Sequence, residues 1–286
     1  MAANAKQPAV ITTVSGFDPT PPALQPASTT TTTTAPLPVT PPQRKVKVRT
    51  TLPFSPLPPL ATRQPLETER LRLVPITQDL LPDYHWIRTQ PEYMVNSRQG
   101  RPDRDLAETQ KWMDRFVPPG DQHTYTFAIK MKKEPSAAAA AAEGEEAAFE
   151  SRAIGMMGIV RMNRGTGWPE IGYGINNTHH GRGYATELLR EVLKFWWSLP
   201  REEVVVEMDA KYVFGTAEDG DGGHAADKAD GIVVDMPERV MAIADVTNLP
   251  SLRVMEKVGF TQFASFVFED DDPPLPVVAS WLLRPA

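Results

Sequence analysis

The sequence predicts an α+β fold in which a long central sheet is flanked by helices and preceded by a disordered arm. Periodic hydrophobic patterns begin only at Leu66. From there the patterns indicate, in order, a strand, two helices, three strands, a helix, a strand, a helix and two strands. Runs of strands that do not alternate with helices are typical of α+β domains.

Residues 1–65 are rich in proline and threonine. They hold 14 of the 29 prolines and an unbroken threonine run at 29–34. Proline fixes φ and removes a backbone donor, and a polar run offers no apolar surface whose burial would offset the entropy cost of ordering. We therefore expect a disordered arm over 1–65 that is dispensable for folding, followed by one folded domain over 66–286.

The first elements of the domain follow from alternation and from helical spacing. Leucines that alternate with charged residues predict an edge strand over 69–76, ended by Pro75. Apolar residues at helical spacing predict helices over 80–87 and 106–116, and alternation predicts a strand over 124–130.

Two stretches interrupt these patterns. Residues 133–151 contain an alanine run followed by glutamates, and residues 209–238 hold five of the 18 glycines. Neither stretch has an apolar face, so we expect two surface insertions that the fold does not need. Between them, strands are predicted over 153–162 and 170–176, and the turn that joins the strands predicts a hairpin.

The strongest helix signal lies at 184–197. Apolar side chains recur on one face of this segment and charged side chains on the other. The remaining patterns predict a strand over 239–244, a helix over 252–258 that Gly259 ends, and strands over 261–268 and 277–284.

Composition excludes several classes of function. Residues 1–66 carry a net charge of +5 and the remainder −11. Because an acidic domain repels polyphosphate, we expect no nucleic-acid partner. The chain has no cysteine, which excludes disulfides, a thiol nucleophile and thiolate zinc sites. No apolar run is long enough to span a bilayer and no secretory signal is evident, so we expect no membrane partner and a cytoplasmic or nuclear location.

No metal site is expected either. His179 and His180 adjoin, but no third ligand stands at metal-binding spacing. The acidic run at 269–272 is followed by prolines, which is typical of a solvated loop rather than a calcium site.

One junction has the features of a phosphate-binding turn. The predicted strand at 170–176 leads into His180-Gly181-Arg182-Gly183-Tyr184-Ala185-Thr186, where a helix begins. Glycine lets a ligand approach the backbone, and the first amides of a helix have no partner within it. A phosphate would satisfy those amides and the positive end of the helix dipole. Arg182 could add a cation and Thr186 a hydroxyl, although a simple tight turn would also fit this pattern.

The turn resembles the cofactor motif of the GNAT N-acetyltransferase superfamily, Arg/Gln-x-x-Gly-x-Gly/Ala. Gly183 and Ala185 match the motif, while His180 stands in place of the first Arg or Gln. A second segment, Asn-Leu-Pro-Ser-Leu-Arg-Val-Met-Glu-Lys-Val-Gly-Phe at 248–260, is similar to a segment of the branch that acetylates protein N-termini and antibiotics. The resemblance covers 66–286 and implies a mixed, mostly antiparallel sheet and acetyl-CoA as co-substrate.

The resemblance also implies roles for individual residues. His180 and the turn at 181–186 would hold the pyrophosphate of coenzyme A. Residues 174–176 (Gly174, Ile175 and Asn176) would pair with the pantetheine arm, in an opening between the strands at 170–176 and 239–245. Asn248 would contact the cofactor, and Ser251 would lie near the thioester sulfur.

Acetyl transfer requires a neutral amine. At pH 7, deprotonation costs a lysine side chain about 4.6 kcal/mol and an α-amine about 1 kcal/mol. Glu170 is the candidate base, directly or through water, with Asp245 or water alone as alternatives, unless Glu170 is only a surface carboxylate. Ser251 is the candidate proton donor to the departing thiolate, or the N-cap of the following helix. Backbone N–H groups near Gly174 or Ile175 would meet the oxyanion.

Two other functions are compatible with the sequence. The domain could be a non-catalytic acyl-CoA-binding module that acts through protein partners, or an anchor for the arm in a scaffold role. For an enzyme, the acceptor could be a protein or peptide N-terminus or a small-molecule amine, and the acidic domain favours a cationic one. The sequence does not determine the oligomeric state.

Overall fold

A computed structural model describes residues 45–132, 152–162, 167–214, 233–268 and 274–285. All of them belong to one unit, Pro42–Ala286. The expected insertion at 133–151, the acidic run at 269–272 and residues 1–44 of the expected arm lie outside the described residues.

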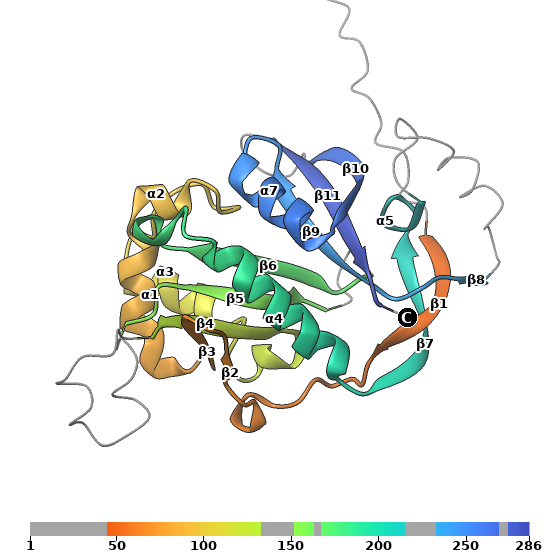
Figure 1. The fold of residues 1–286 in the computed structure, drawn as a ribbon, viewed down its shortest axis with the longest axis horizontal. Coiled ribbons are helices and arrows are strands. Elements are labelled where there is room, and N and C mark those ends of the chain that lie inside the picture. The colour runs from red at the N-terminus through yellow and green to blue at the C-terminus, as the bar shows by residue number, and fades with distance from the viewer. Residues whose placement is uncertain (1–44, 133–151, 163–166, 215–232, 269–273, 286) are drawn as a thin grey trace, which may run out of the picture. The chain divides into compact units, whose positions relative to one another are not determined.

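An eight-stranded sheet forms the centre of this unit (Figure 1). Its strands are β2 (Leu66–Glu67), β3 (Leu71–Pro75), β4 (Tyr125–Met131), β5 (Gly155–Arg161), β6 (Glu170–Ile175), β9 (Arg239–Asp245), β10 (Thr261–Phe268) and β11 (Leu275–Leu283). The order across the sheet is β10-β11-β9-β6-β5-β4-β3-β2. β6 and β9 run parallel and the other described neighbours antiparallel, so the expected mixed, mostly antiparallel sheet is confirmed.

Helices pack on both faces of this sheet (Figure 1). They are α1 (Leu81–Arg88), α2 (Pro91–Met94), α3 (Leu106–Met113), α4 (Tyr184–Ser198) and α7 (Leu249–Val258). The short helix α5 (Lys211–Phe214) belongs to a third core cluster, with residues 46, 48 and 208. The predicted apolar face of α4 is buried in a core cluster with Ile171 and Ile175 of β6. On the opposite face, Tyr84 and Ile87 of α1 pack in a second cluster with Met113 of α3 and Met156 of β5.

A second sheet corrects the expected extent of the arm. Its order is β7-β1-β8, with β7 at Arg201–Asp209, β1 at Lys45–Pro53 and β8 at Val233–Asp235. β1 pairs along its whole length with β7, from Lys45 opposite Asp209 to Pro53 opposite Arg201. The prediction of a disordered arm is therefore wrong for residues 45–65.

The residues of β1 alternate in the way a half-buried strand requires. Val46 and Val48 are at most 2 % exposed and share a core cluster with Met208 and Met241. Lys45, Lys47 and Arg49, which alternate with these valines, are exposed. This period of two is visible in the sequence, but the valines gain a buried site only when β7, far along the chain, pairs with β1.

Residues 54–65 are held against the sheet by a buried arginine. Arg63 is 4 % exposed, and its guanidinium lies 4.3 Å from the ring centroid of Tyr125. It donates to Asp121 O at 2.8 Å and to Pro58 O at 2.9 Å. Asp121 in turn accepts the amide of Leu60 at 2.9 Å. These contacts make the segment part of the domain.

The second insertion is also narrower than expected. α5 begins at Lys211 and β8 at Val233, so both ends of the predicted insertion at 209–238 contain secondary structure. Residues 215–232 lie outside the described part of the chain.

Candidate active site

β6 and β9 separate immediately after they meet. Their ladder consists of one described pair, Glu170 opposite Met241, next to a bond from Met241 N to Pro169 O at 2.8 Å. β6 stays paired with β5 as far as Ile175, and β9 stays paired with β11 as far as Asp245. The facing edges of the two strands therefore form an opening beyond Glu170, where the resemblance implied one.

The backbone N–H and C=O groups of β6 point alternately toward β5 and toward this opening. The amide of Asn176 donates to Ile154 O at 2.7 Å, and the carbonyl of Gly174 lies against Gly155 of β5. Because backbone groups alternate sides along a strand, the odd-numbered residues of β6 turn theirs toward β9.

This alternation refines the predicted cofactor contacts. Of the three residues expected to pair with a pantetheine arm, Ile175 directs its backbone groups toward the opening, whereas those of Gly174 and Asn176 face β5. The carbonyl of Ile175 already accepts from His180 Nε2 at 2.7 Å. Tyr173, which the sequence reasoning missed, turns its N–H and C=O toward the opening.

The side chains of β6 divide between two faces. Tyr173 packs on the face covered by α4. Three residues away, Glu170 lies on the other face, because side chains alternate with a period of two. Gly172 and Gly174 share the face of Glu170, where a Cβ would meet Val160 at 3.0 Å and the Tyr93 hydroxyl at 2.6 Å.

Glu170 is mostly, not fully, buried at the closed end of the opening. Its side chain is 14 % exposed, and Oε2 lies 3.4 Å from Arg161 Nη1. Among the described residues, none donates a hydrogen bond to Oε2. Burial raises the pKa of this carboxyl, and the charges of Arg161 and Arg98 offset part of that rise. Glu170 is thus a better base than an exposed glutamate.

The turn at 180–186 brings uncapped amides to the end of β6. Gly181 and Gly183 have φ of 74° and 81°, a region in which glycine is free of strain. Gly183 is the N-cap of α4 and provides no side-chain acceptor, so the first amides of the helix point outward uncapped. These amides, with Thr186 and Arg182 beside them, could hold a diphosphate.

Arg70 holds this turn through hydrogen bonds, a role that the sequence analysis did not predict. Its Nη1 donates to Arg182 O at 2.9 Å, and its Nε donates to Glu187 Oε2 at 2.8 Å. The guanidinium also lies 4.5 Å from the ring centroid of Tyr184. No local pattern reveals a contact across 112 residues of chain.

Asn248 and Ser251 begin α7 on the face of Tyr173. Asn248 is the N-cap, since its side chain accepts the amide of Ser251 at 3.2 Å, so the suggestion that Ser251 caps the helix is wrong. Ser251 Oγ lies 2.7 Å from the hydroxyl of Tyr173. Asp245, the alternative base, accepts the amide and hydroxyl of Thr247 in a turn.

The other face of the opening is bordered by α2. Gln90 Oε1 accepts from Asn176 Nδ2 at 2.7 Å. Tyr93 stands over Gly174, and burial raises the pKa of its hydroxyl to about 12. Sequence patterns did not single out either residue, because a four-residue helix has too little periodicity to be recognised.

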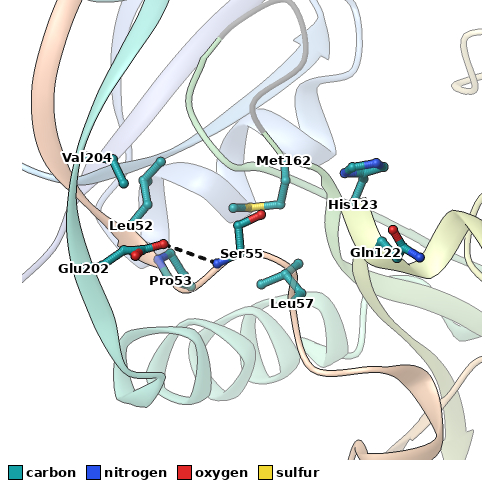
Figure 2. A pocket seen from close by; sticks show the side chains of 9 residues that line it. All are labelled: Leu52, Pro53, Ser55, Leu57, Gln122, His123, Met162, Glu202 and Val204. Atoms are coloured by element: carbon teal, nitrogen blue, oxygen red, sulfur yellow. Dashed lines mark hydrogen bonds between the residues drawn. The ribbon is translucent and has the colours of Figure 1, made fainter.

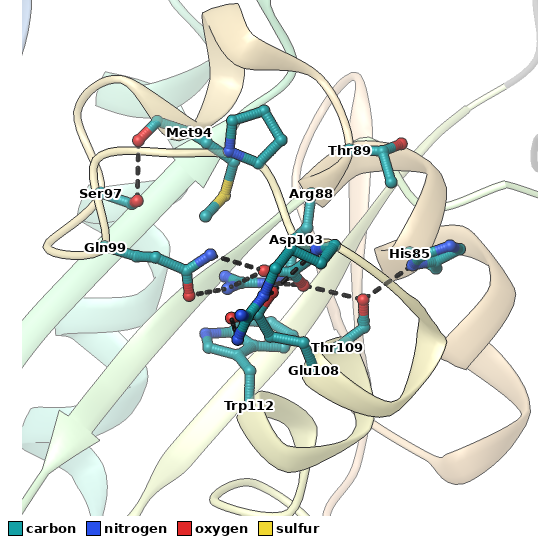
Figure 3. Close-up of polar contacts among 12 residues, drawn as sticks. His85, Arg88, Thr89, Met94, Ser97, Gln99, Asp103, Glu108, Thr109 and Trp112 are labelled. Carbon is teal, nitrogen blue, oxygen red and sulfur yellow. Dashed lines mark hydrogen bonds and ion pairs between the residues drawn. The ribbon is translucent and has the colours of Figure 1, made fainter.

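A buried ion pair fixes the helices on this face (Figure 3). Arg88 donates to both carboxylate oxygens of Asp103, at 2.7 and 2.9 Å, and Thr109 Oγ1 adds a bond at 2.8 Å. Burial raises the pKa of Asp103, but the hydrogen bonds from Arg88, Thr109 and Gln99 outweigh it and hold the pKa below its ordinary value. The pair ties α1 to α3 and supports the segment that carries Tyr93.

The structure also contains a cavity apart from this opening (Figure 2). It measures about 300 Å³ and is lined by β1, β7 and the segment before β4. Ser55 N donates to Glu202 Oε1 at 3.4 Å at its edge. None of its lining residues belongs to β6, α7 or the turn at 180–186.

Among the described residues, no cluster of three or more His, Asp or Glu side chains could hold a metal. Nor is any helix in the described ranges long and apolar enough to cross a bilayer.

The chain is similar to several solved structures. No curated protein matches the sequence. Among solved structures, it is similar to a GNAT-family acetyltransferase from Bacillus anthracis, with 17% identity over 77% of this chain and 99% of that one and a TM-score of 0.46. It is also similar to an acetyltransferase from Agrobacterium tumefaciens (20% identity, 76% and 94% coverage, TM-score 0.44). A third similar structure is spermidine N-acetyltransferase from Vibrio cholerae, in complex with CoA and spermine (14% identity, 76% and 97% coverage, TM-score 0.47).

The sequence family described as acetyltransferase (GNAT) domain matches residues 70–261. This match spans about two thirds of the chain and includes the turn at 180–186, β6, β9 and α7. The chain belongs to the GNAT acetyltransferase family.

Proposed function

We propose that this protein is an N-acetyltransferase that moves an acetyl group from acetyl-CoA to a primary amine, either a protein N-terminus or a small molecule. The observation that carries the proposal is the opening between β6 and β9, which has Glu170 on one face and Ser251 on the other. An acid and a base on opposite faces suit a reaction in which the amine and the thiol lie on opposite sides of the acetyl carbon.

Acetyl-CoA fits the backbone groups at this place. The uncapped amides at 183–186 would bind the diphosphate, and Arg182 would add a charge. The backbone groups of Tyr173 and the amide of Ile175 would pair with the pantetheine arm. One of these two amides, the one beside the thioester, would instead donate to the acetyl oxygen as it gains negative charge.

The reaction needs proton transfers at nitrogen and at sulfur. Glu170 takes a proton from the protonated amine, directly or through water, and the neutral nitrogen then forms a bond to the acetyl carbon. The nitrogen gains a positive charge in this step and loses its second proton to solvent as the amide forms. As the carbon–sulfur bond breaks, Ser251 gives its hydroxyl proton to the departing sulfur and regains one from solvent. The buried position of Glu170, with an oxygen that accepts no described hydrogen bond, supports catalysis over a non-catalytic acyl-CoA-binding module.

A screen of acceptors tests the activity. The full chain is incubated with acetyl-CoA and a peptide with a free N-terminus, an amino acid, a polyamine or an aromatic amine, and free thiol is measured. We expect thiol release above the rate without enzyme for at least one amine. Coenzyme A binding without thiol release on any amine would favour the binding module, and no binding would remove both functions.

A negative charge introduced into the turn tests the cofactor site. Gly183→Asp places a carboxylate beside the amides proposed to hold the diphosphate, so we expect calorimetry to detect no coenzyme A binding. Gly100→Asp is the matched control, because Gly100 also has a positive φ, 66°, with open space around it. Unchanged affinity in the Gly183 variant would place the diphosphate elsewhere.

A further inference from the structure

We propose that Tyr173 is a positioning residue that directs the hydroxyl proton of Ser251 into the opening between β6 and β9. The inference rests on the proposed function, in which Ser251 protonates the departing sulfur. It assigns a role to a side chain that no sequence motif singled out.

The geometry limits what the two hydroxyls can do. Tyr173 Oη lies 2.7 Å from Ser251 Oγ and 3.2 Å from Ser251 O. One of the two hydroxyls must donate across the 2.7 Å contact, and each has a single proton. If Tyr173 donates to Ser251 Oγ, the proton of Ser251 is free to point elsewhere. If Tyr173 donates instead to Ser251 O, at 3.2 Å, Ser251 donates to Tyr173 Oη and its proton is turned away from the sulfur. The shorter distance to Oγ favours the first arrangement.

The surroundings favour Tyr173 as the donor. Burial raises the pKa of its hydroxyl above the ordinary 10, although the bond to Ser251 offsets part of the rise, so Tyr173 keeps its proton through the neutral range. The backbone of Ser251 is held by the side chain of Asn248, which fixes Oγ relative to the strand. Ser251 can then donate to sulfur while it accepts from Tyr173.

The role requires no proton from Tyr173 itself. The carbon–sulfur electron pair goes to sulfur, sulfur receives the proton of Ser251, and Ser251 regains a proton from solvent. Tyr173 holds its own proton throughout, which avoids forming a phenolate in a buried site.

The test is a double-mutant cycle in the full chain with the best acceptor from the screen. Tyr173→Phe keeps the ring and removes the hydroxyl. We expect it to lower kcat about tenfold, the upper range for one neutral hydrogen bond, with the KM for acetyl-CoA within about twofold of wild type. Ser251→Ala should lower kcat about 10²-fold, and the double variant should match Ser251→Ala, since Tyr173 acts only through Ser251.

Controls separate positioning from packing. Tyr125→Phe removes a hydroxyl from β4 of the same sheet, away from the opening, and should leave kcat unchanged. Active-site concentration is taken from coenzyme A titration, so that a loss of folded protein cannot imitate a loss of rate.

The outcomes distinguish the inference from the function on which it rests. Full kcat in Tyr173→Phe, or multiplied effects in the double variant, would overturn the role of Tyr173 and leave the acetyltransferase intact. An effect on KM for acetyl-CoA alone would also overturn it. A wild-type chain that acetylates no amine would remove both.

Discussion

At the start of β6, Glu170 has a carboxylate oxygen, Oε2, that accepts no described hydrogen bond. The same oxygen lies 3.4 Å from Arg161 Nη1. Glu170→Gln keeps the shape of this side chain and removes its basic site. We expect turnover to fall by about 10²–10⁴-fold, with coenzyme A affinity unchanged and the acidic limb of the pH profile lost. An α-amine acceptor should tolerate the change better than a lysine, because it costs less to deprotonate.

The matched control is Glu203→Gln, since Glu203 is an exposed glutamate of β7. Steady-state rates on each active acceptor, at low and high pH, measure the effect. Normal turnover of the Glu170 variant under all these conditions would leave Asp245 or water as the proton acceptor.

Burial of Glu170 also predicts a pH-dependent stability. Because its pKa is raised in the folded state above the ordinary 4.5, the folded state binds its proton more tightly than the unfolded chain does. The resulting stability is fully present below pH 4.5 and is lost as pH rises through the folded pKa. We therefore expect Glu170→Gln to melt above wild type at pH 7, with a difference that shrinks toward pH 4.5. A lower melting temperature at pH 7 would show that the contact with Arg161 outweighs burial.

At the scale of elements, the second sheet is an addition that the sequence did not predict, and β1 is its central strand. Val48 is fully buried between the two sheets, whereas Lys47 beside it is exposed. Val48→Ala should lower the free energy of unfolding by about 2 kcal/mol, from lost burial and an unfilled cavity. For a domain of this size that corresponds to roughly 4–8 °C in Tm, which calorimetry can measure. Lys47→Ala is the control, and equal Tm changes in the two variants would show that β1 does not pack as described.

For the whole molecule, the boundary between dispensable and required sequence moves from 65 to the start of β1. Removal of residues 1–44 leaves every described contact in place, so we expect little change in Tm. Removal of 1–53 deletes β1 and exposes the side of β7 that it covers, so we expect poor solubility or a large loss of Tm. Thermal melting of the two truncations decides the point. A 1–53 truncation as stable as the full chain would restore the arm to its predicted length.

The sequence by itself determined the elements whose stabilisation is local. The helix at 184–198 follows from one apolar face, and the turn before it needs glycine at two positions of positive φ. The two motifs also marked Ser251 and the amides of the turn as candidates, because each lies within a short segment, and Glu170 was a candidate from its place on the predicted strand before the turn. These features depend on neighbours in the chain, which a pattern can record.

The tertiary structure decided everything that depends on distant partners. β1 is a strand because β7 pairs with it, and its valines have no buried site without that pairing. Tyr173 meets Ser251 across 78 residues, and Arg70 meets the turn across 112. The register of β6 against β5 decided which amides face the opening and put Glu170 and Tyr173 on opposite faces. The sequence of a strand shows that its side chains alternate between two faces. Only pairing with the neighbouring strands fixes which face meets which partner.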